Sequence, residues 1–433
     1  MDRRKMFPAA ILAAVMIALA GCGKEEPASS SQQTIPEEQP ALETQEEKPA
    51  KEPSAAETSK PEMAIPKPII GEKPAYYDTM EIMDGFMVFQ ISSVQDLVEL
   101  SDFVARGNST DNGVFSLTKD IDMGGIDFVP IGTVESPFTG RFLGGGHSIT
   151  NLKVRVEENH PAGFFGVLGG EAHVRELNLE GEVTGISKVG GFVGQLGWLK
   201  TDSGQFSTAE IIRSSFKGKV SGVQSDIGGF AGSVSEGSFI SQCFAEAEVT
   251  GQESLGGFVG TAGQYGLISQ CYSRGTVKAD LRDNWLAAYN IPEPEENWGT
   301  QPSPEQEIMV RYVGGFAGMN VGDIFESYSA SEVNTLSEAK TVGGFLGYEA
   351  GRDGQCVYLV DNNSQWEPGF AVGDNAEMKV RGFTAEEMAL PESYSWDFYF
   401  VWDMGQEGLP VFKPAQPMTP GEYVGLYLGG GGG

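Results

Sequence analysis

The sequence predicts an all-β protein built as a solenoid of stacked coils, and two observations lead to this fold class. A short phrase of Gly, Phe, an apolar residue and Gly recurs down the chain as "VGGFVG", "IGGFAG", "LGGFVG", "VGGFAG" and "VGGFLG", with a looser "AGFFGV" before them. Between the phrases, apolar and polar residues alternate and are rich in Val, Ile, Phe and Tyr, as is typical of strands. Self-similarity at a fixed period is characteristic of repeat architectures.

The phenylalanines of the phrases set the length of one coil. Their successive spacings are 28, 38, 28, 58 and 29 residues, so a coil of 28 residues carries two insertions. Equivalent residues of stacked coils lie above one another at the interstrand spacing of about 4.8 Å. We therefore expect one internal ladder of rings, with the flanking glycines at corners that need positive φ or close backbone approach. The ladder consists of Phe164, Phe192, Phe230, Phe258, Phe316 and Phe345.

The first 75 residues are expected to lie outside the folded body. Residues 1–21 have a basic start, an apolar run and small residues before Cys22, as a signal peptide does. Leu19-Ala20-Gly21-Cys22 resembles the lipobox of bacterial lipoproteins, which implies cleavage before Cys22 and lipidation of that residue. Residues 22–75 are rich in Pro and Glu and poor in apolar side chains, so we expect a lipid-anchored, disordered acidic stalk.

Residues 76–160 are expected to hold an N-terminal cap and the first coils. The stretch "SSVQDLVELSDFVARGN" has helical spacing, and Ser93 with Asp96 makes a plausible capping pair. Such a helix would cover the open edge of the solenoid and prevent pairing with another edge. Its expected apolar face consists of Val94, Leu97, Val98, Phe103 and Val104.

Residues 161–360 hold the repeats, with insertions near 196–209 and 279–310. The longer insertion carries Trp285, Tyr289 and Trp298, which are the candidate ligand-binding residues because loops on a rigid scaffold collect such residues. Exposed aromatic rings would suit a sugar face or a protein partner; alternatively, Trp285 and Tyr289 only pin the loop to the solenoid. Residues 361–420, dense in aromatic residues, are expected to form a C-terminal cap, and residues 421–433 a disordered Gly tail.

The sequence offers little recognisable catalytic chemistry. It contains no H-E-x-x-H zinc motif, no G-x-S-x-G elbow and no P-loop. We expect His147, His160 and His173 at the surface or in turns. A further cluster in "KDIDMGGIDF" favours turn chemistry, in which Asp bonds to nearby backbone, over calcium ligation. This cluster consists of Asp120, Asp122 and Asp127.

The cysteines of the repeats raise the question of a disulfide. Cys243 and Cys271 are 28 residues apart and share one column, with Leu177, Ser215 and Ser327 as neighbours, whereas Cys356 falls off it. Stacking would bring the two Cα atoms within disulfide range, but parallel Cβ directions fit that geometry poorly. We therefore favour free, inward-facing thiols.

Three stretches together resemble the GLUG-motif bacterial surface proteins. They are "FQISSVQDLVELSDFV", "FSLTKDIDMGGIDFVPIGTVESPFTGRFLGGGHSITNLKV" and the repeats themselves, and "EGLPVFK" after Trp402 is also similar. The resemblance implies a right-handed parallel β-helix on secreted or anchored proteins, including regions of adhesins and of immunoglobulin-A-cleaving surface peptidases. One departure is visible, because the family's "FDGNGY" is replaced here by residues 142–147, "FLGGGH".

These observations predict a lipoprotein of the bacterial cell envelope whose β-helix is a non-catalytic scaffold for adhesion or ligand binding. The net charge of −31 argues against nucleic acid and against anionic lipid surfaces as partners. We expect a monomer that binds a host protein or a glycan, is held to the membrane by its lipid anchor, and needs no cofactor or metal. Two alternatives stay open: a polysaccharide hydrolase or lyase on the same scaffold, and a structural envelope protein with inert insertions.

Overall fold

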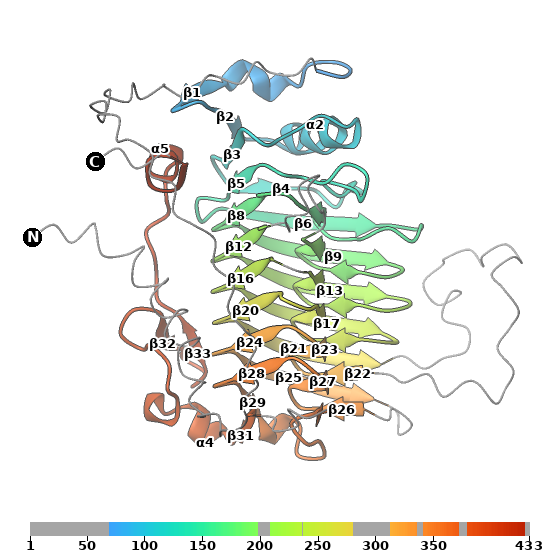
Figure 1. Ribbon diagram of the computed structural model, residues 1–433, viewed down its shortest axis with the longest axis vertical. Coiled ribbons are helices and arrows are strands. Elements are labelled where there is room, and N and C mark those ends of the chain that lie inside the picture. Colours follow the sequence, from blue (N-terminus) through green and yellow to red (C-terminus); the bar gives the residue numbers. More distant parts are fainter. Residues whose placement is uncertain are drawn as a thin grey trace, which may run out of the picture. The chain divides into compact units, whose positions relative to one another are not determined.

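The computed structural model describes residues 69–197, 208–235, 237–279, 312–335, 341–371 and 379–428 of the chain. The chain divides into two units, Met1–Lys60 and Pro61–Gly433, and all of the described residues belong to the second. This second unit is mostly β, with four large sheets whose strands pair in parallel except for β1 with β2 (Figure 1). Among the described residues, no helix is both long and apolar enough to cross a membrane.

In Figure 1 the strands of the two longest sheets follow one another along the vertical axis of the picture. The ten-stranded sheet contains, in spatial order, β1 (Glu81–Met83), β2 (Phe86–Ile91), β3 (Gly113–Leu117), β5 (Arg141–Leu143), β8 (His173–Arg175), β12 (Glu210–Ile212), β16 (Phe239–Ser241), β20 (Leu267–Ser269), β24 (Asp323–Phe325) and β28 (Arg352–Gly354). The nine-stranded sheet contains β4 (Ile121–Asp122), β6 (Ser148–Arg155), β9 (Asn178–Gly185), β13 (Ser215–Gly222), β17 (Phe244–Gly251), β21 (Tyr272–Ala279), β25 (Tyr328–Thr335), β29 (Val357–Leu359) and β31 (Arg381–Phe383).

Two shorter parallel sheets and one hairpin complete the β-structure. The seven-stranded sheet contains β7 (Phe165–Leu168), β11 (Val193–Leu196), β15 (Ala231–Val234), β19 (Val259–Ala262), β23 (Ala317–Asn320), β27 (Leu346–Glu349) and β30 (Phe370–Ala371). The five-stranded sheet contains β10 (Val189–Gly190), β14 (Ile227–Gly228), β18 (Leu255–Gly256), β22 (Tyr312–Gly314) and β26 (Thr341–Gly343). The hairpin is formed by β32 (Trp402–Met404) and β33 (Pro410–Phe412), which pair antiparallel.

The described residues form few helical segments, and these are short. They are η2 (Ala75–Thr79), α2 (Val94–Ala105), η3 (Val360–Asn362), α4 (Ala385–Met388), η4 (Pro391–Ser393), α5 (Pro420–Tyr423) and the π-helical η5 (Val424–Leu428). The fold is therefore all-β and resembles a parallel β-helix.

Each of the five central coils contributes one strand to each of the four sheets. β8, β9, β10 and β11 form one coil, and β12 to β15 form the next. The pairing is residue for residue, so that Val220 lies beside Val183 in the coil before and Val249 in the coil after. Inward-facing columns follow from this register; one consists of the fully buried Val174, Ile211, Ile240, Ile268 and Ile324.

Stacked phenylalanine rings fill the centre of the coils. Neighbouring ring centroids are 4.7 to 4.9 Å apart, with planes within 13° of parallel. This separation is the interstrand distance, because the rings come from equivalent positions of coils in register. The stacked rings are those of Phe192, Phe230, Phe258, Phe316 and Phe345, and none of them is exposed.

The sixth phenylalanine of the expected ladder, Phe164, is also fully buried but packs differently. Its ring stacks on Phe128 at 5.4 Å and meets Phe165 edge to face at 4.9 Å. Phe165 in turn contacts Phe192 at 5.8 Å, with its ring tilted by 40°. The first repeat has a second aromatic ring where the later repeats have Val, Ala or Leu, and this extra ring replaces regular stacking with a cluster.

The glycines of the phrase allow the backbones of neighbouring coils to approach closely, and they do not adopt unusual backbone angles. A Cβ on Gly257 would overlap the carbonyl oxygen of Gly315 in the next coil, and a Cβ on Gly315 would overlap that of Gly344. None of these three has a positive φ, so the part of the prediction that placed them at left-handed corners is wrong. Within the repeats, most of the positions with positive φ are taken by polar residues instead.

Those polar residues form a column at the turn between the ten-stranded and nine-stranded sheets. Arg213 donates to Gln242 at 2.8 Å, Gln242 to Gln270 at 3.1 Å, and Gln270 to Glu326 at 2.9 Å. All members of the column have φ between 48° and 57°. The hydrogen bonds between coils compensate for the backbone strain that a non-glycine residue carries there. The column comprises Glu176, Arg213, Gln242, Gln270, Glu326 and Gln355.

Helix α2 lies at the N-terminal end of the stack, close to β2 and β3 (Figure 1). The side chain of Ser93 accepts a hydrogen bond from the backbone N–H of Asp96 at 3.2 Å, which confirms the predicted capping pair. Val98 is 37% exposed, so its assignment to the apolar face is wrong. Leu100 takes that place, because it lies three residues after Leu97 and four before Val104 on the buried side.

The chain turns back after the last coils and runs along the outside of the solenoid (Figure 1). We call residues 394–428 the return segment. Its hairpin packs on the nine-stranded sheet, where the buried Trp402 contacts Tyr272 and Tyr328 and the Tyr328 hydroxyl donates to the carbonyl of Pro410 at 2.6 Å. Farther along, the backbone N–H of Met418 donates to Glu176 at 2.8 Å.

The end of the return segment packs on the first coils. Tyr423 and Val424 are buried against Val88, Val114 and Leu143 of the ten-stranded sheet. The expectation of a disordered tail from residue 421 is therefore wrong for residues 421–428, since these apolar contacts offset the entropy of ordering them. The assignment of residues 361–420 to a C-terminal cap is wrong for residues 394–420, which pack on the side of the stack. Residues 429–433 lie outside the described part.

Candidate functional site

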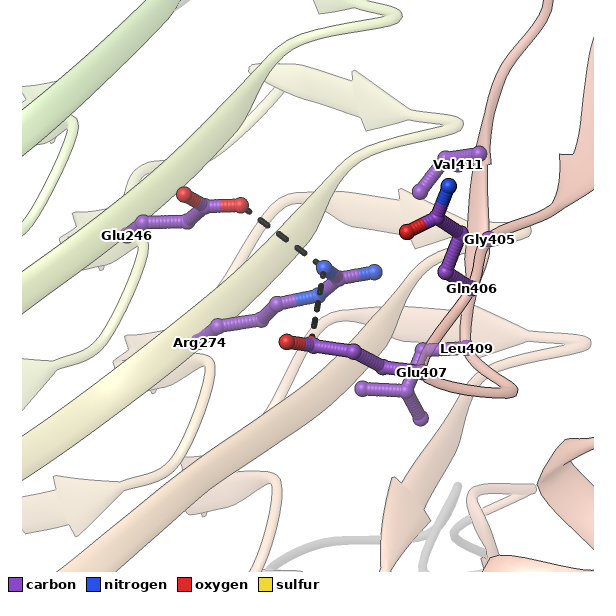
Figure 2. Close-up of a pocket in the computed structure, with 7 residues that line it drawn as sticks. All are labelled: Glu246, Arg274, Gly405, Gln406, Glu407, Leu409 and Val411. Carbon is purple, nitrogen blue, oxygen red and sulfur yellow. Dashed lines mark ion pairs between the residues drawn. The ribbon is translucent and has the colours of Figure 1, made fainter.

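A solvent-open pocket of 460 Å³ lies between the nine-stranded sheet and the hairpin of the return segment. The sheet supplies two charged side chains and the hairpin supplies the opposite wall (Figure 2). The lining residues are Glu246, Arg274, Gly405, Gln406, Glu407, Leu409 and Val411.

The register of the sheet places the two charged side chains side by side. Glu246 on β17 pairs with Arg274 on β21. Both follow the alternation of a half-buried sheet, because the flanking residues Ala245 and Ala247 face the interior and are buried. Glu246 and Arg274 therefore point outward, where the hairpin meets them.

Arg274 is held rigidly by its neighbours. Its Nε and Nη2 atoms donate to the hydroxyl of Tyr328 at 3.0 and 2.6 Å, and Nη2 also donates to the carbonyl of Pro410 at 3.0 Å. The guanidinium lies 4.7 Å from the ring centre of Tyr272. Burial works to lower the pKa of Arg274, but Tyr328, Tyr272 and Glu246 together raise it above its ordinary value, so the side chain stays charged.

The remaining guanidinium nitrogen, Nη1, faces two carboxylates. Glu246 Oε1 is 3.7 Å away and Glu407 Oε2 is 3.9 Å away, one from the sheet and one from the hairpin (Figure 2). These distances exceed the usual 2.7–3.2 Å of an N–H···O hydrogen bond by roughly half an ångström or more. The other oxygen of Glu246 pairs with Lys217 at 2.7 Å. In the pocket, the fixed Nη1 of Arg274 therefore lies between the carboxylates of Glu246 and Glu407 without a short hydrogen bond to either.

A second pair of carboxyl groups lies inside the last coils. Glu349 is 4% exposed and follows Asn320 and Ala262 of the two preceding coils, whereas Asp353 is 8% exposed and follows the apolar Ile324. The amide of Asn320 donates to both oxygens of Glu349, and the backbone N–H of Lys379 donates to Asp353. Burial, followed by the charge of Asp353, raises the pKa of Glu349 to about 7. Because both groups are enclosed, a polymeric substrate cannot reach them.

The other residues named from the sequence are spread over the chain. Cys22, Trp285, Tyr289 and Trp298 lie outside the described residues. Asp122 accepts from the backbone N–H of Gly124 at 2.8 Å, which confirms turn chemistry at this position. In the same cluster, Asp120 accepts from the backbone of Ser148, and Asp127 pairs with Lys153. Among the described residues, no group of three or more His, Cys, Asp or Glu side chains could hold a metal ion.

The three histidines do not form a site. His147 and His160 pair with the neighbouring acids Asp120 and Glu158 near the surface. His173 lies in strand β8 and its Nδ1 is 2.8 Å from the hydroxyl of Tyr423, so its assignment to the surface or a turn is wrong. Burial, followed by the charges of Arg141 and Arg175, lowers the pKa of His173 to about 4.

The three cysteines of the described residues, Cys243, Cys271 and Cys356, are free and buried, in agreement with the favoured expectation for the first two. Two details of their predicted column are wrong. Ser214, not Ser215, stands beside Cys243, because Ser215 pairs with Phe244. Cys356 does belong to the column, since Val357 pairs with Tyr328 and its thiol repeats the contacts of Cys243 with carbonyl oxygens of its own and the preceding coil.

The comparisons with known proteins come from sequence and from structure. The family model described as the GLUG motif matches residues 251–278, which run from the end of β17 into β21 and include Phe258 and Arg274. A crystal structure of a putative immunoglobulin A1 protease from Bacteroides ovatus is similar, with a TM-score of 0.56 and 22% sequence identity over 76% of this chain and 92% of that one. No curated protein matches the chain. One segment of the chain thus matches the GLUG motif, and the fold of the chain is similar to that of this structure.

Proposed function

We propose that the protein is a cell-surface lipoprotein whose β-helix is a rigid, non-catalytic scaffold for adhesion or ligand binding. In this proposal the coils are right-handed, helix α2 closes the N-terminal end of the stack, and the segment from η3 to η4 closes the other. The protein is a monomer whose binding partner is a host protein or a glycan.

The observation that carries the proposal is that the coils do not need the long insertion. Residues 280–311 take the place of only two residues, 252 and 253, of the preceding coil. On one side of the insertion Ala279 still pairs with Gly251, and on the other Val313 still pairs with Leu255. A segment that leaves and rejoins a stack without disturbing its register is free to serve binding.

The membrane anchor of the proposal depends on Cys22. The lipobox-like sequence before it supports lipidation, and several acyl chains hold a protein far more firmly than one. We expect the Cys22→Ser variant to leave the membrane fraction and to be recovered in the medium or the periplasm, as measured by fractionation and immunoblotting. Retention of this variant at the wild-type level would contradict the proposed anchor.

Loop replacement tests the binding function. We would replace residues 280–311 by the Gln-Glu dipeptide of residues 252–253, and probe the full chain on a glycan array and against purified glycoproteins. Immunoglobulin A1 belongs among these, because the similar structure is named for it. The matched control replaces residues 197–209 by the turn of residues 235–238 at another corner. Loss of binding only in the first variant supports a binding site in the insertion, and unchanged binding in both variants contradicts that role of the insertion.

A polysaccharide hydrolase is the second candidate, because Glu246 and Glu407 flank one pocket. Their carboxylate oxygens share one nitrogen as neighbour and lie no more than about 8 Å apart, within the widest spacing of paired glycosidase carboxyl groups. Two positive side chains, Lys217 and Arg274, accompany them. This balance favours binding over acid–base chemistry, which requires one carboxyl group to carry a proton. Release of reducing ends that disappears in Glu407→Gln would establish the hydrolase instead.

A further inference from the structure

We propose that the pocket formed by Glu246, Arg274 and Glu407 binds a neutral saccharide through two adjacent hydroxyl groups. The inference rests on the binding function proposed above, and it names both the class of ligand and its place on the scaffold. It assigns the site to the sheet and the hairpin rather than to the long insertion.

The charges around the pocket favour a neutral ligand. Two carboxylates, Glu246 and Glu407, are accompanied by two cations, Arg274 and Lys217. An anionic ligand would approach two carboxylates, and a cationic ligand would approach a guanidinium that is already fixed in place. A ligand without net charge meets neither repulsion.

The hydrogen-bonding groups of the pocket fit a pair of neighbouring hydroxyls. Nη1 of Arg274 carries two N–H groups, and the carboxylates beside it lie at 3.7 and 3.9 Å, beyond ordinary hydrogen-bond length. A hydroxyl group can donate and accept at the same time. One hydroxyl can therefore donate to Glu246 and accept from Nη1, while its neighbour donates to Glu407 and accepts from the second N–H.

The rest of the pocket suits the apolar face of a sugar. Leu409 and Val411 line the wall opposite the sheet, and the amide of Gln406 adds one more donor and acceptor. The volume of 460 Å³ falls within the range of roughly 300–1,000 Å³ typical of small-molecule sites. Because Tyr328, Tyr272 and Pro410 hold Arg274 in place, little of its side-chain freedom is lost on binding.

The test compares two carboxylates on the same strand. Glu246 and Glu248 both face outward from β17 and both pair with a lysine, Lys217 or Lys219, but only Glu246 lines the pocket. The full chain is screened on an array of neutral and sialylated oligosaccharides, and the best neutral binder is titrated by calorimetry. We expect Glu246→Gln and Glu407→Gln to weaken binding by about tenfold or more, and Glu248→Gln to leave it unchanged.

Thermal melts verify that each variant is folded; Glu407 is 80% exposed, so its substitution leaves the core untouched. The inference is overturned if no neutral saccharide binds, or if Glu407→Gln binds as tightly as Glu248→Gln. If replacing residues 280–311 abolishes binding while both pocket variants bind normally, the proposed binding function stands and the pocket is not its site. If the pocket variants lose binding and the loop replacement does not, the pocket stands and the role given to the insertion fails.

Discussion

Truncating one ring of the central phenylalanine stack is the most direct probe of the scaffold. Phe258 is fully buried, with Phe230 on one side and Phe316 on the other, each at 4.9 Å. A buried Phe→Ala change costs about 3–5 kcal/mol, because transfer free energy is lost and a cavity remains. Each stacked ring pair adds about 0.5–1.5 kcal/mol beyond buried area. Phe258 stacks on both sides, and the register of the coils prevents its neighbours from closing the gap. We therefore expect Phe258→Ala to lower the free energy of unfolding by about 4–5 kcal/mol, in the upper part of that range.

The assay is chemical unfolding of the full chain, followed by tryptophan fluorescence and circular dichroism. The control is Tyr265→Ala, since this ring is 66% exposed and its removal should change the free energy of unfolding by no more than about 0.5 kcal/mol. The Phe258→Leu side chain fills most of the volume but cannot stack, so its loss in the free energy of unfolding should lie between those of Phe258→Ala and Tyr265→Ala. If Phe258→Ala were as mild as Tyr265→Ala, the stack would not be the core of the scaffold, and the reasoning would fail.

Two further predictions concern the last and the first coils. The pKa of Glu349 is raised from its ordinary 4.5 to about 7, so this group favours folding below pH 4.5 and the contribution is lost as the pH rises through 7. Glu349→Gln should therefore flatten part of the decline in unfolding midpoint between these pH values, which denaturant titrations at several pH values measure; an unaltered profile would contradict the assignment. Tyr423→Phe removes the hydrogen bond to His173 and should destabilise the end of the return segment by about 0.5–1.5 kcal/mol. Faster amide exchange in α5, with unchanged exchange in β21, is the expected result, and identical rates in both proteins would speak against it.

The repeats could be predicted from the sequence because their signal is periodic. Phe occupies the equivalent position in each of these coils, so the spacing alone predicts that the ring of Phe230 stacks on the ring of Phe258. The same logic places Cys356 beside Ser327, since their separation of 29 residues equals that between Phe316 and Phe345. The error at this column came from applying the 28-residue spacing to a coil that is one residue longer.

The pocket and the return segment could not be predicted in the same way. Arg274 and Pro410 are 136 residues apart, and their contact depends on how an aperiodic segment packs on the outside of the stack. The aromatic residues before Lys413 indicate burial but not the surface that buries them. Likewise, Tyr423 precedes a run of glycines that predicts disorder, and only the apolar surface of β3 and β5 explains why it is ordered.

The return segment also changes how the stack can come apart. In a solenoid whose coils touch only their neighbours, the terminal coils can peel away singly while the middle persists. Here the return segment contacts the later coils through Trp402 and the first coils through Tyr423, so it connects coils that do not touch one another. Detachment of either end removes part of these contacts, so we expect the stack to unfold in a single cooperative step rather than coil by coil.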